Sequence, residues 1–417
     1  MKNKTSLRHD PYAALRIREF SFFISARFFL TLAIQMQGVI ISWQIYKITG
    51  SYFHSGMIGL AEALPLIITS LFSGHVADNY SRKKITLIGG FFYAVSILAL
   101  FYFSLDTSNV IIRFGILPIY IVIFFTGIIR GFLSAAIPAY MAQIVPRELY
   151  SNAATWNSSI WYIGFIGGNT IGGFLCAVGV PFAYSIDAGF IVIALAFLVF
   201  IASKPIPKKD KTETLSESIS SGLKFVFKSQ VLLGALSLDL FAVLFGGAVA
   251  LLPFFASDVL KVHSIGFGFL RAAPAIGAIF MAFLLAYRPQ KKNAGRNLLI
   301  SVFMFGLCTI LFAASSNFYL SLFLLFLAGA FDNVSVVVRH TILQLLTPDN
   351  MRGRVSAVNS IFISSSNEIG AFESGIAAAA MGLIPSVIFG GVMTILVVGA
   401  TFKFAPELRK LDISQIT

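Results

Sequence analysis

Several charged residues occur inside long apolar stretches of this sequence, where an unpaired charge is costly. A charged side chain near the centre of a bilayer costs at least ~2.5–3.5 kcal/mol, so such residues mark transport pathways, proton relays or buried ion pairs. Desolvation disfavours the charged form of a carboxylate, whereas a nearby arginine favours it. A carboxylate held between these two influences can bind and release a proton. The candidate proton-coupling residues are therefore Glu62, Arg130, Asp239, Arg271, Asp332 and Glu368.

The sequence alone leaves open which of these acids would carry the proton. We rank them in the order Glu62, Asp332, Asp239 and Glu368. The alternative for each is a static ion pair that only locks two helices together. Two further charges lie closer to the ends of their apolar stretches: Arg27 could snorkel to the membrane surface, and Asp187 could lie at the opposite interface.

The elements that would position these charges are long apolar segments. The chain has 417 residues, of which 57% are hydrophobic and only 12% are charged. Soluble domains carry about 25% charged residues. Segments of about 20 apolar residues recur, and a helix of that length crosses ~30 Å of hydrocarbon. The sequence therefore predicts an all-α membrane protein with twelve spans, near residues 20–44, 54–76, 85–104, 116–140, 153–176, 183–203, 229–256, 264–286, 297–315, 318–346, 354–380 and 384–404.

The net charge of +13 reflects where the bases lie along the chain, and it does not indicate nucleic-acid binding. With twelve spans both termini lie on one side, and most of the 31 lysines and arginines fall in the loops of that side. The loops of the other side hold Lys47, Arg113 and Lys261. The positive-inside rule makes the basic side cytoplasmic. Both termini lie on this basic side, so we expect both to be cytoplasmic. The first apolar segment is too long for a signal peptide, so we expect no cleavage.

The spans divide into two halves that resemble each other. A polar segment with an amphipathic helical pattern, residues 204–228, separates residues 1–203 from residues 229–417. Glycine and proline positions repeat between the halves at nearly constant offsets, as with Gly127 and Gly329. Such a repeat is typical of transporters, whose substrate site lies between the repeats. We expect an N-terminal six-helix domain, a cytoplasmic linker helix and a C-terminal six-helix domain.

The repeat places opposite charges at equivalent positions. Glu62 aligns with Arg271, and Arg130 aligns with Asp332. This arrangement would allow an acid of one half to pair with an arginine of the other half across a central cavity. Protonation of either acid would then release its arginine.

The loop between the second and third spans, residues 73–85, reads SGHVADNYSRKKI. It resembles the loop motif Gly-x-Leu-Ala-Asp-Arg-x-Gly-Arg-Lys of the major facilitator superfamily, with matches that include Gly74, Asp78, Arg82 and Lys83. The resemblance implies a twelve-helix fold of two pseudo-symmetric six-helix bundles that works by alternating access. It also implies a cytoplasmic latch, in which Asp78 would sit near residues 353–356. The alternative is that the bases only anchor the topology and that Asp78 is solvated.

Glycines in the fifth span resemble a helix motif typical of the superfamily's antiporters. The matching positions are Gly164, Gly168, Gly172 and Gly173, and Asn169 stands where proline is usual. Glycines spaced four residues apart let two helices approach closely. The resemblance favours an exporter over a symporter, and plain helix packing is the alternative.

Nearly the whole chain also resembles one branch of that superfamily, the enterobactin exporters and macrolide efflux proteins. The segments that carry this resemblance include residues 183–188 and 347–355. The branch implies efflux of siderophores or drugs in exchange for protons, by a monomer in the bacterial cytoplasmic membrane. We place a siderophore first and a macrolide or multidrug substrate second. A lipid transporter and a non-transporting membrane protein are the remaining alternatives.

No catalytic, metal-binding or nucleotide-binding motif is visible in the sequence. Its two cysteines lie in separate spans, and neither a Walker A motif nor a zinc-ligand spacing occurs. We therefore expect no enzymatic activity and no cofactor, and the partners would be the substrate, protons and membrane lipid. An amphiphilic aromatic substrate would contact polar and aromatic side chains, for which the candidates are Gln35, Gln37, Trp43, Trp161 and Asn169.

Overall fold

The computed structural model describes residues 10–205, 215–287, 292–348 and 351–412, and these residues are almost entirely helical. The membrane helices of the N-terminal group are α1 (Arg18–Thr49), α2 (Tyr52–Asn79), α3 (Arg82–Ser104), α5 (Leu117–Ile144), α6 (Tyr150–Val178) and α7 (Val180–Val199). Those of the C-terminal group are α9 (Gln230–Gly246), α11 (His263–Tyr287), α12 (Ala294–Ala314), α13 (Phe318–Leu346), α14 (Arg352–Met381) and α15 (Leu383–Phe404).

The predicted all-helical membrane fold is confirmed. Among the described residues, 11 helices are long and apolar enough to cross a membrane, with α9 counted together with the short helices after it. The twelfth long helix, α14, matches the others in length but carries more polar residues, including Asn367, Glu368 and Glu373. Part of the segment 347–355, namely residues 349–350, lies outside the described residues.

Short helices complete the connections. They are η1 (Ala14–Arg16), η2 (Asp106–Ser108), α4 (Val110–Phe114), η3 (Arg147–Leu149), η4 (Ala248–Leu251), α10 (Leu252–Phe254), the π-helical η5 (Phe255–Val259) and α16 (Pro406–Arg409). The seventh predicted span, residues 229–256, is therefore not one continuous helix. The α-helix ends at Gly246, because Gly247 leaves the helical region with φ −85° and ψ 77°.

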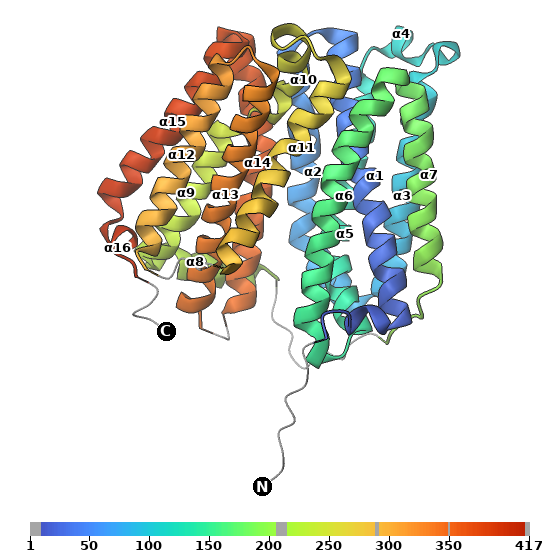
Figure 1. The fold of residues 1–417 in the computed structure, drawn as a ribbon. Coiled ribbons are helices and arrows are strands. Elements are labelled where there is room, and N and C mark those ends of the chain that lie inside the picture. The colour runs from blue at the N-terminus through green and yellow to red at the C-terminus, as the bar shows by residue number, and fades with distance from the viewer. Residues whose placement is uncertain (1–9, 206–214, 288–291, 349–350, 413–417) are drawn as a thin grey trace.

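The two groups of helices lie side by side, and each is packed mainly within itself (Figure 1). In the N-terminal group α1 packs against α6 and α7, and α2 packs against α5. In the C-terminal group α11 packs against α13, and α12 packs against α13 and α15. The groups touch each other chiefly where α2 meets α14 and where α6 meets α11. The division into two domains with a linker stays a prediction.

The groups approach most closely toward the end of the molecule that lies opposite the two termini. We call this end, which holds the connections near residues 50, 106–116, 179, 247–262 and 315–317, the distal end (Figure 1). A Cβ atom on Gly56 of α2 would lie 2.7 Å from the Cα atom of Gly375 on α14. Likewise, a Cβ atom on Gly173 of α6 would lie 2.7 Å from the Cα atom of Gly268 on α11. Only glycine allows these helices to come so close.

Aromatic and polar contacts close the distal end further. The Trp43 ring stacks on Phe267 of α11 with ring centroids 6.0 Å apart. The Tyr46 hydroxyl donates a hydrogen bond of 2.7 Å to an Asp258 carboxylate oxygen on η5. These contacts join α1 to the C-terminal group, so the distal side is shut in this conformation.

The linker contains the predicted amphipathic helix as α8 (Leu215–Lys228). It packs against α14, because a Cβ atom on Gly222 would lie 2.9 Å from the Arg354 carbonyl oxygen. Val226 is fully buried, whereas Phe227 is 61% exposed. One face of α8 is thus docked on the C-terminal group while the other remains available to the membrane surface.

Candidate functional site

An ion pair joins Glu62 on α2 to Arg130 on α5. The side chains are 16% and 31% exposed, respectively. A glycine one turn before Arg130 makes the pair possible, since a Cβ atom on Gly127 would lie 2.7 Å from the Glu62 carbonyl oxygen. The two helices therefore touch at backbone distance where the pair forms.

Two further charges extend this pair across the boundary between the groups. Arg271 on α11 donates hydrogen bonds to the Gly38 carbonyl oxygen (3.3 Å) and the Ser42 hydroxyl (3.2 Å) of α1. Glu368 on α14 lies within electrostatic range of both Arg271 and Arg130. We call Glu62, Arg130, Arg271 and Glu368 the four-charge cluster, which draws one residue from each of α2, α5, α11 and α14.

The ion pair of Glu62 lies within its own group in this conformation, so pairing of Glu62 across the boundary stays a prediction. Glu62 pairs with Arg130 of its own group, and not with its repeat equivalent Arg271. The reason is the close approach of α2 and α5 at Gly127, which brings Arg130 to the nearest acid. The electrostatic interaction between the groups involves Glu368, which interacts with Arg130 and Arg271. Glu368 was the last of the four acids in our ranking of candidate proton carriers.

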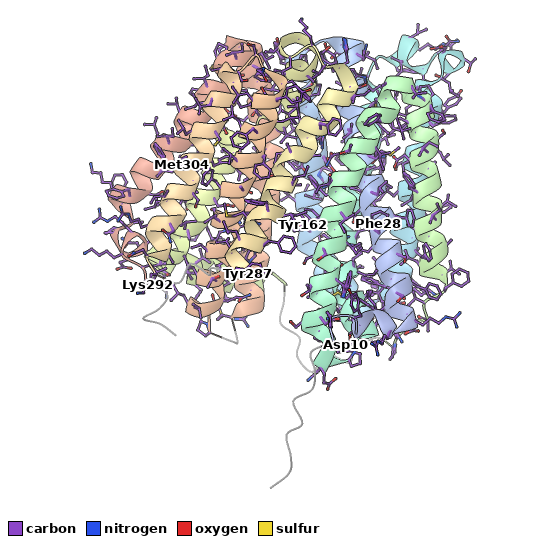
Figure 2. All side chains as sticks on the ribbon, in the orientation of Figure 1. Asp10, Phe28, Tyr162, Tyr287, Lys292 and Met304 are labelled. Carbon is purple, nitrogen blue, oxygen red and sulfur yellow. The ribbon has the colours of Figure 1, made fainter. Side chains whose placement is uncertain are left out.

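Asp332 lies apart from the cluster, on α13. Its neighbour across the boundary is Tyr162 of α6. The Tyr162 hydroxyl interacts with the Asn333 side chain and lies within electrostatic range of Asp332. Figure 2 shows Tyr162 projecting from α6 toward the C-terminal group. Among the described residues, no ion pair joins Asp332 to a base.

Asp239 also lies apart from the cluster, buried inside the C-terminal group. It forms an ion pair with Arg339, and the two side chains are only 7% and 2% exposed. The pair connects α9 with α13. A buried ion pair within one group fits the alternative to proton coupling that we considered for every intramembrane acid, namely a static pair that only holds two helices together.

Gln37 and Trp43, two of the predicted cavity residues, are buried in helix contacts. Gln37 accepts a hydrogen bond from the Tyr93 hydroxyl, so it faces α3. Trp43 is 3% exposed and belongs to the distal closure. Both side chains point into contacts between helices. The sequence pattern alone did not distinguish such contacts from the wall of a substrate cavity.

The other three predicted cavity residues lie on or against α6. Trp161 is half-buried, and its ring centroid lies 5.1 Å from that of Tyr162. Gln35 is half-buried beside Gly168. Asn169 is fully buried, and its amide donates to the Phe165 carbonyl oxygen (2.8 Å) within the helix. Trp161 and Gln35 thus remain the better candidates for substrate contact.

The charged loop is tied to its own group by its bases. Arg82 forms a 3.6 Å ion pair with Asp78 and donates a 3.0 Å hydrogen bond to the Ala139 carbonyl oxygen of α5. Lys83 donates to the Val199 carbonyl oxygen at the end of α7 (3.0 Å). Gly74 lies one turn before Asp78 on α2, with open space where a Cβ atom would be. The side chain of Ser356, in the predicted latch partner, lies outside the described residues, so the latch stays a prediction.

The glycine motif of α6 forms two helix contacts. Cβ atoms on Gly164 and Gly172 would each lie 3.1 Å from side chains of α1, and one on Gly168 would lie 2.5 Å from the Leu32 carbonyl oxygen. Gly173 faces α11 instead. The motif therefore packs α6 onto both α1 and the C-terminal group, which places it where the two groups would move against each other.

Adding one methyl group to this motif is expected to destabilise the protein in a position-dependent manner. Gly168→Ala forces its Cβ atom against the α1 backbone and is expected to cost ~1–3 kcal/mol. Gly167→Ala is the matched control, because its Cβ atom would meet only a Leu32 methyl group at 3.9 Å. Thermal unfolding of the purified variants in detergent measures both. Equal melting temperatures for the two variants would contradict the packing role.

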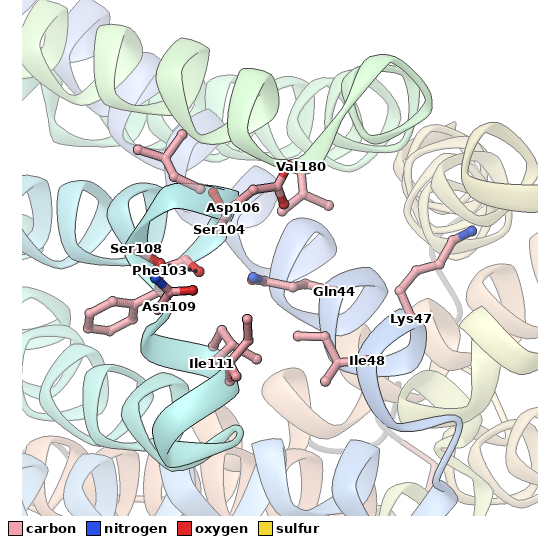
Figure 3. A pocket seen from close by; sticks show the side chains of 12 residues that line it. Gln44, Lys47, Ile48, Phe103, Ser104, Asp106, Ser108, Asn109, Ile111 and Val180 are labelled. Atoms are coloured by element: carbon pink, nitrogen blue, oxygen red, sulfur yellow. Dashed lines mark hydrogen bonds between the residues drawn. The ribbon is translucent and has the colours of Figure 1, made fainter.

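A separate hollow lies at the distal end of the N-terminal group, away from the four-charge cluster. It has a volume of about 400 Å³ and lies between α1, the α3–α5 connection and the start of α7 (Figure 3). Its polar lining includes Gln44, Lys47, Asp106 and Asn109. We call it the distal pocket.

The sequence model of the family described as Major Facilitator Superfamily matches residues 23–370 of this chain. The enterobactin exporter EntS of Shigella dysenteriae serotype 1 is 25% identical over 385 residues, which cover 92% of this chain and 91% of the relative. EntS of Shigella flexneri is 25% identical over 386 residues, with the same coverage of both chains.

Solved structures share the fold at low sequence identity. The nucleoside transporter NupG has a TM-score of 0.73 and 14% identity, covering 93% of this chain and 99% of its own. A bacterial homologue of the human lysosomal transporter Spinster, in an inward-facing and unoccupied conformation, has a TM-score of 0.72 and 14% identity, with 96% and 97% covered. A D-xylose–proton symporter has a TM-score of 0.71 and 15% identity, with 96% and 100% covered.

Proposed function

The chain belongs to the Major Facilitator Superfamily, and on this premise we propose that it exports a small amphiphilic molecule in exchange for protons. The chain is a multi-pass membrane transporter, and its relatives are transporters rather than enzymes. The proposed substrate class is a siderophore, which is supported by relatives named as enterobactin exporters over 92% of the chain. A macrolide or other drug is the second candidate, favoured by the aromatic surface of Trp161 and Tyr162 on α6.

The observation that carries the proton coupling is the four-charge cluster at the contact between the groups. When all four residues are ionised, two acids balance two arginines. Glu368 then attracts Arg130 and Arg271 together, which favours the closed distal side. Protonation of Glu368 leaves the two arginines facing each other without that acid, so the closed conformation is weakened. The protonation state of Glu368 would in this way bias the balance between the two conformations.

The substrate would bind between α6 and α13, at the boundary between the two groups. Tyr162 faces Asn333 and Asp332 across this boundary, and Trp161 and Gln35 lie nearby on α6 and α1. Aromatic rings beside an acid and an amide suit an amphiphile with hydroxyl groups.

The orientation follows from the basic loops. Arg82, Lys83 and Lys84 lie at the end that holds the termini, whereas Lys47 and Lys261 lie at the distal end. We propose that the termini face the cytoplasm of a bacterium and that the protein acts as a monomer in the cytoplasmic membrane. In this orientation the shut distal side is the outer side, so the conformation is inward-facing.

Deleting the gene is expected to change the distribution of one metabolite under iron limitation. A metal-chelating compound should disappear from the medium and accumulate in the cells, as measured by untargeted mass spectrometry of both fractions. Restoring the wild-type gene should restore the parent pattern. If the deletion strain and the parent match in every chelating compound, the siderophore proposal is wrong, and a drug-susceptibility panel then tests the second candidate.

A further inference from the structure

Asp187 on α7 is completely buried, with 0% exposure, although its position near the end of its predicted span suggested an interfacial residue. The reason is its place on one helical stripe with Tyr184 and Ile191, both of which are also fully buried. This stripe faces α1 and α3, against which α7 packs. Neither carboxylate oxygen of Asp187 has a hydrogen-bond partner among the described residues. An ionised carboxylate without a partner is disfavoured in such surroundings, and it neutralises instead.

The groups nearest to Asp187 are hydroxyls and amides. Tyr93 of α3 and Tyr184 of α7 both lie within electrostatic range of its carboxyl group. The Tyr93 hydroxyl donates to Gln37, and the Tyr184 hydroxyl donates to Gln44 with a distance of 2.8 Å. Gln37 and Gln44 are seven residues apart on α1, so both glutamines face the same side of that helix.

No charged side chain pairs with Asp187 in the described part of the chain, and the charges of the distal pocket, Lys47 and Asp106, lie on the far side of Gln44 and Tyr184 in the polar route described below. The titratable groups that face this region are Tyr93 of α3, Tyr184 of α7 and Cys176 of α6, and α1 contributes only the two glutamines. Arginine, lysine and histidine side chains form no ion pair with Asp187 among the described residues. The same residues contain no group of three or more His, Cys, Asp or Glu that could hold a metal ion. The ligand that fits one isolated carboxylate is therefore a proton.

The distal pocket supplies a route to this carboxylate. Gln44 lines the pocket (Figure 3). It also accepts the hydrogen bond of Tyr184, so this one side chain connects the pocket with the interior. Val180 lines the same pocket, one turn before Tyr184 on α7. Polar groups thus continue from the pocket through Gln44 to Tyr184, which lies three residues before Asp187 on α7.

We propose that Asp187 is a proton-binding site inside the N-terminal group, loaded from the distal pocket by way of Tyr184. The Tyr184 hydroxyl, which donates to Gln44 in this conformation, would turn to the Asp187 carboxylate and pass its proton to it. The Tyr184 oxygen would at the same time take a proton from a hydronium ion that reaches it from the pocket. One O–H bond is exchanged at the tyrosine, one O–H bond forms at Asp187, and the hydronium ion is left as water. The site is separate from the four-charge cluster and does not depend on the substrate.

Infrared spectroscopy of the full chain in lipid vesicles tests the proposal without a transport assay. The C=O stretching band of a protonated carboxyl group without a hydrogen bond should be present in the wild type and lost in Asp187→Asn. Asp332→Asn is the matched control, because it removes a different intramembrane acid and should keep the band. If Asp187→Asn keeps the band at every pH, Asp187 does not carry the proton and the proposal is overturned.

Tyr184→Phe tests the route and keeps both Asp187 and the packing of the ring. On transfer to heavy water, the band should shift more slowly in this variant than in the wild type. An equal rate in the two proteins would overturn the route through Tyr184. This variant also serves as the decisive measurement if Asp187→Asn does not fold.

Discussion

Glu62→Gln is expected to reduce export by roughly tenfold or more, which corresponds to ~1.4 kcal/mol or more in the transport barrier. The substitution preserves the size of the side chain but removes the charge that pairs with Arg130. Two arginines would then share Glu368 as the single acid of the cluster. The cluster then has more positive than negative charge whether or not Glu368 is protonated. Protonation can no longer switch the preferred conformation, so the transport cycle should stop in one conformation. Export of the retained metabolite from cells, normalised to protein abundance in the membrane, measures the effect.

Two companion variants make this result specific. Arg130→Ala should lose transport to a similar extent, because it removes the other partner of the pair. Glu373→Gln should transport close to the wild-type level, because Glu373 also lies on α14 but forms no ion pair or hydrogen bond with the four-charge cluster among the described residues. Normal transport by both Glu62→Gln and Arg130→Ala would show that the cluster is not the coupling site.

Arg339→Met is expected to destabilise the protein by ~3–5 kcal/mol, because it leaves a buried acid without its partner. Both Asp239 and Arg339 are almost completely buried, so water cannot compensate for the lost charge. The double variant Asp239→Leu/Arg339→Met should recover most of this loss, since apolar side chains of similar size replace a buried pair at little cost. Reversible unfolding of the purified proteins in mixed micelles measures all three.

Transport by the double variant shows whether the Asp239–Arg339 pair only holds two helices together or takes part in proton coupling. If the pair only fixes α9 against α13, the stable double variant should export at close to the wild-type rate. Loss of export by a stable double variant would instead return Asp239 to the coupling residues. A double variant no more stable than Arg339→Met would contradict the buried-pair account.

Much of the fold could be predicted from hydropathy alone, because the length of an apolar segment decides whether it crosses a membrane. Breaks within segments were harder to predict. The span 229–256 looks continuous by composition, yet its α-helix ends at Gly246 and resumes as short helices around Pro253. Consecutive glycines at 246 and 247 were the available signal. Apolar length reports the number of spans, whereas glycine and proline positions report their interruptions.

The positions of the intramembrane charges could be predicted, but their partners could not. Pairing depends on how closely helices approach, and Gly127 decides that Arg130 meets Glu62. The repeat related Glu62 to Arg271 by symmetry, and symmetry does not imply contact. Asp187 was misplaced for a similar reason, since its distance along α7 says less than the face of α7 on which it lies. Its spacing of three residues from Tyr184 was the signal that could have shown this.

The most direct test of the account is proton-driven accumulation in everted membrane vesicles that contain the protein. With the lumen made acidic, the vesicles should accumulate the metabolite retained by the deletion strain, and a protonophore should abolish the accumulation. Addition of the metabolite should also release protons from the lumen, and Glu62→Gln vesicles should do neither. Accumulation that persists unchanged without a pH gradient would contradict proton-coupled export.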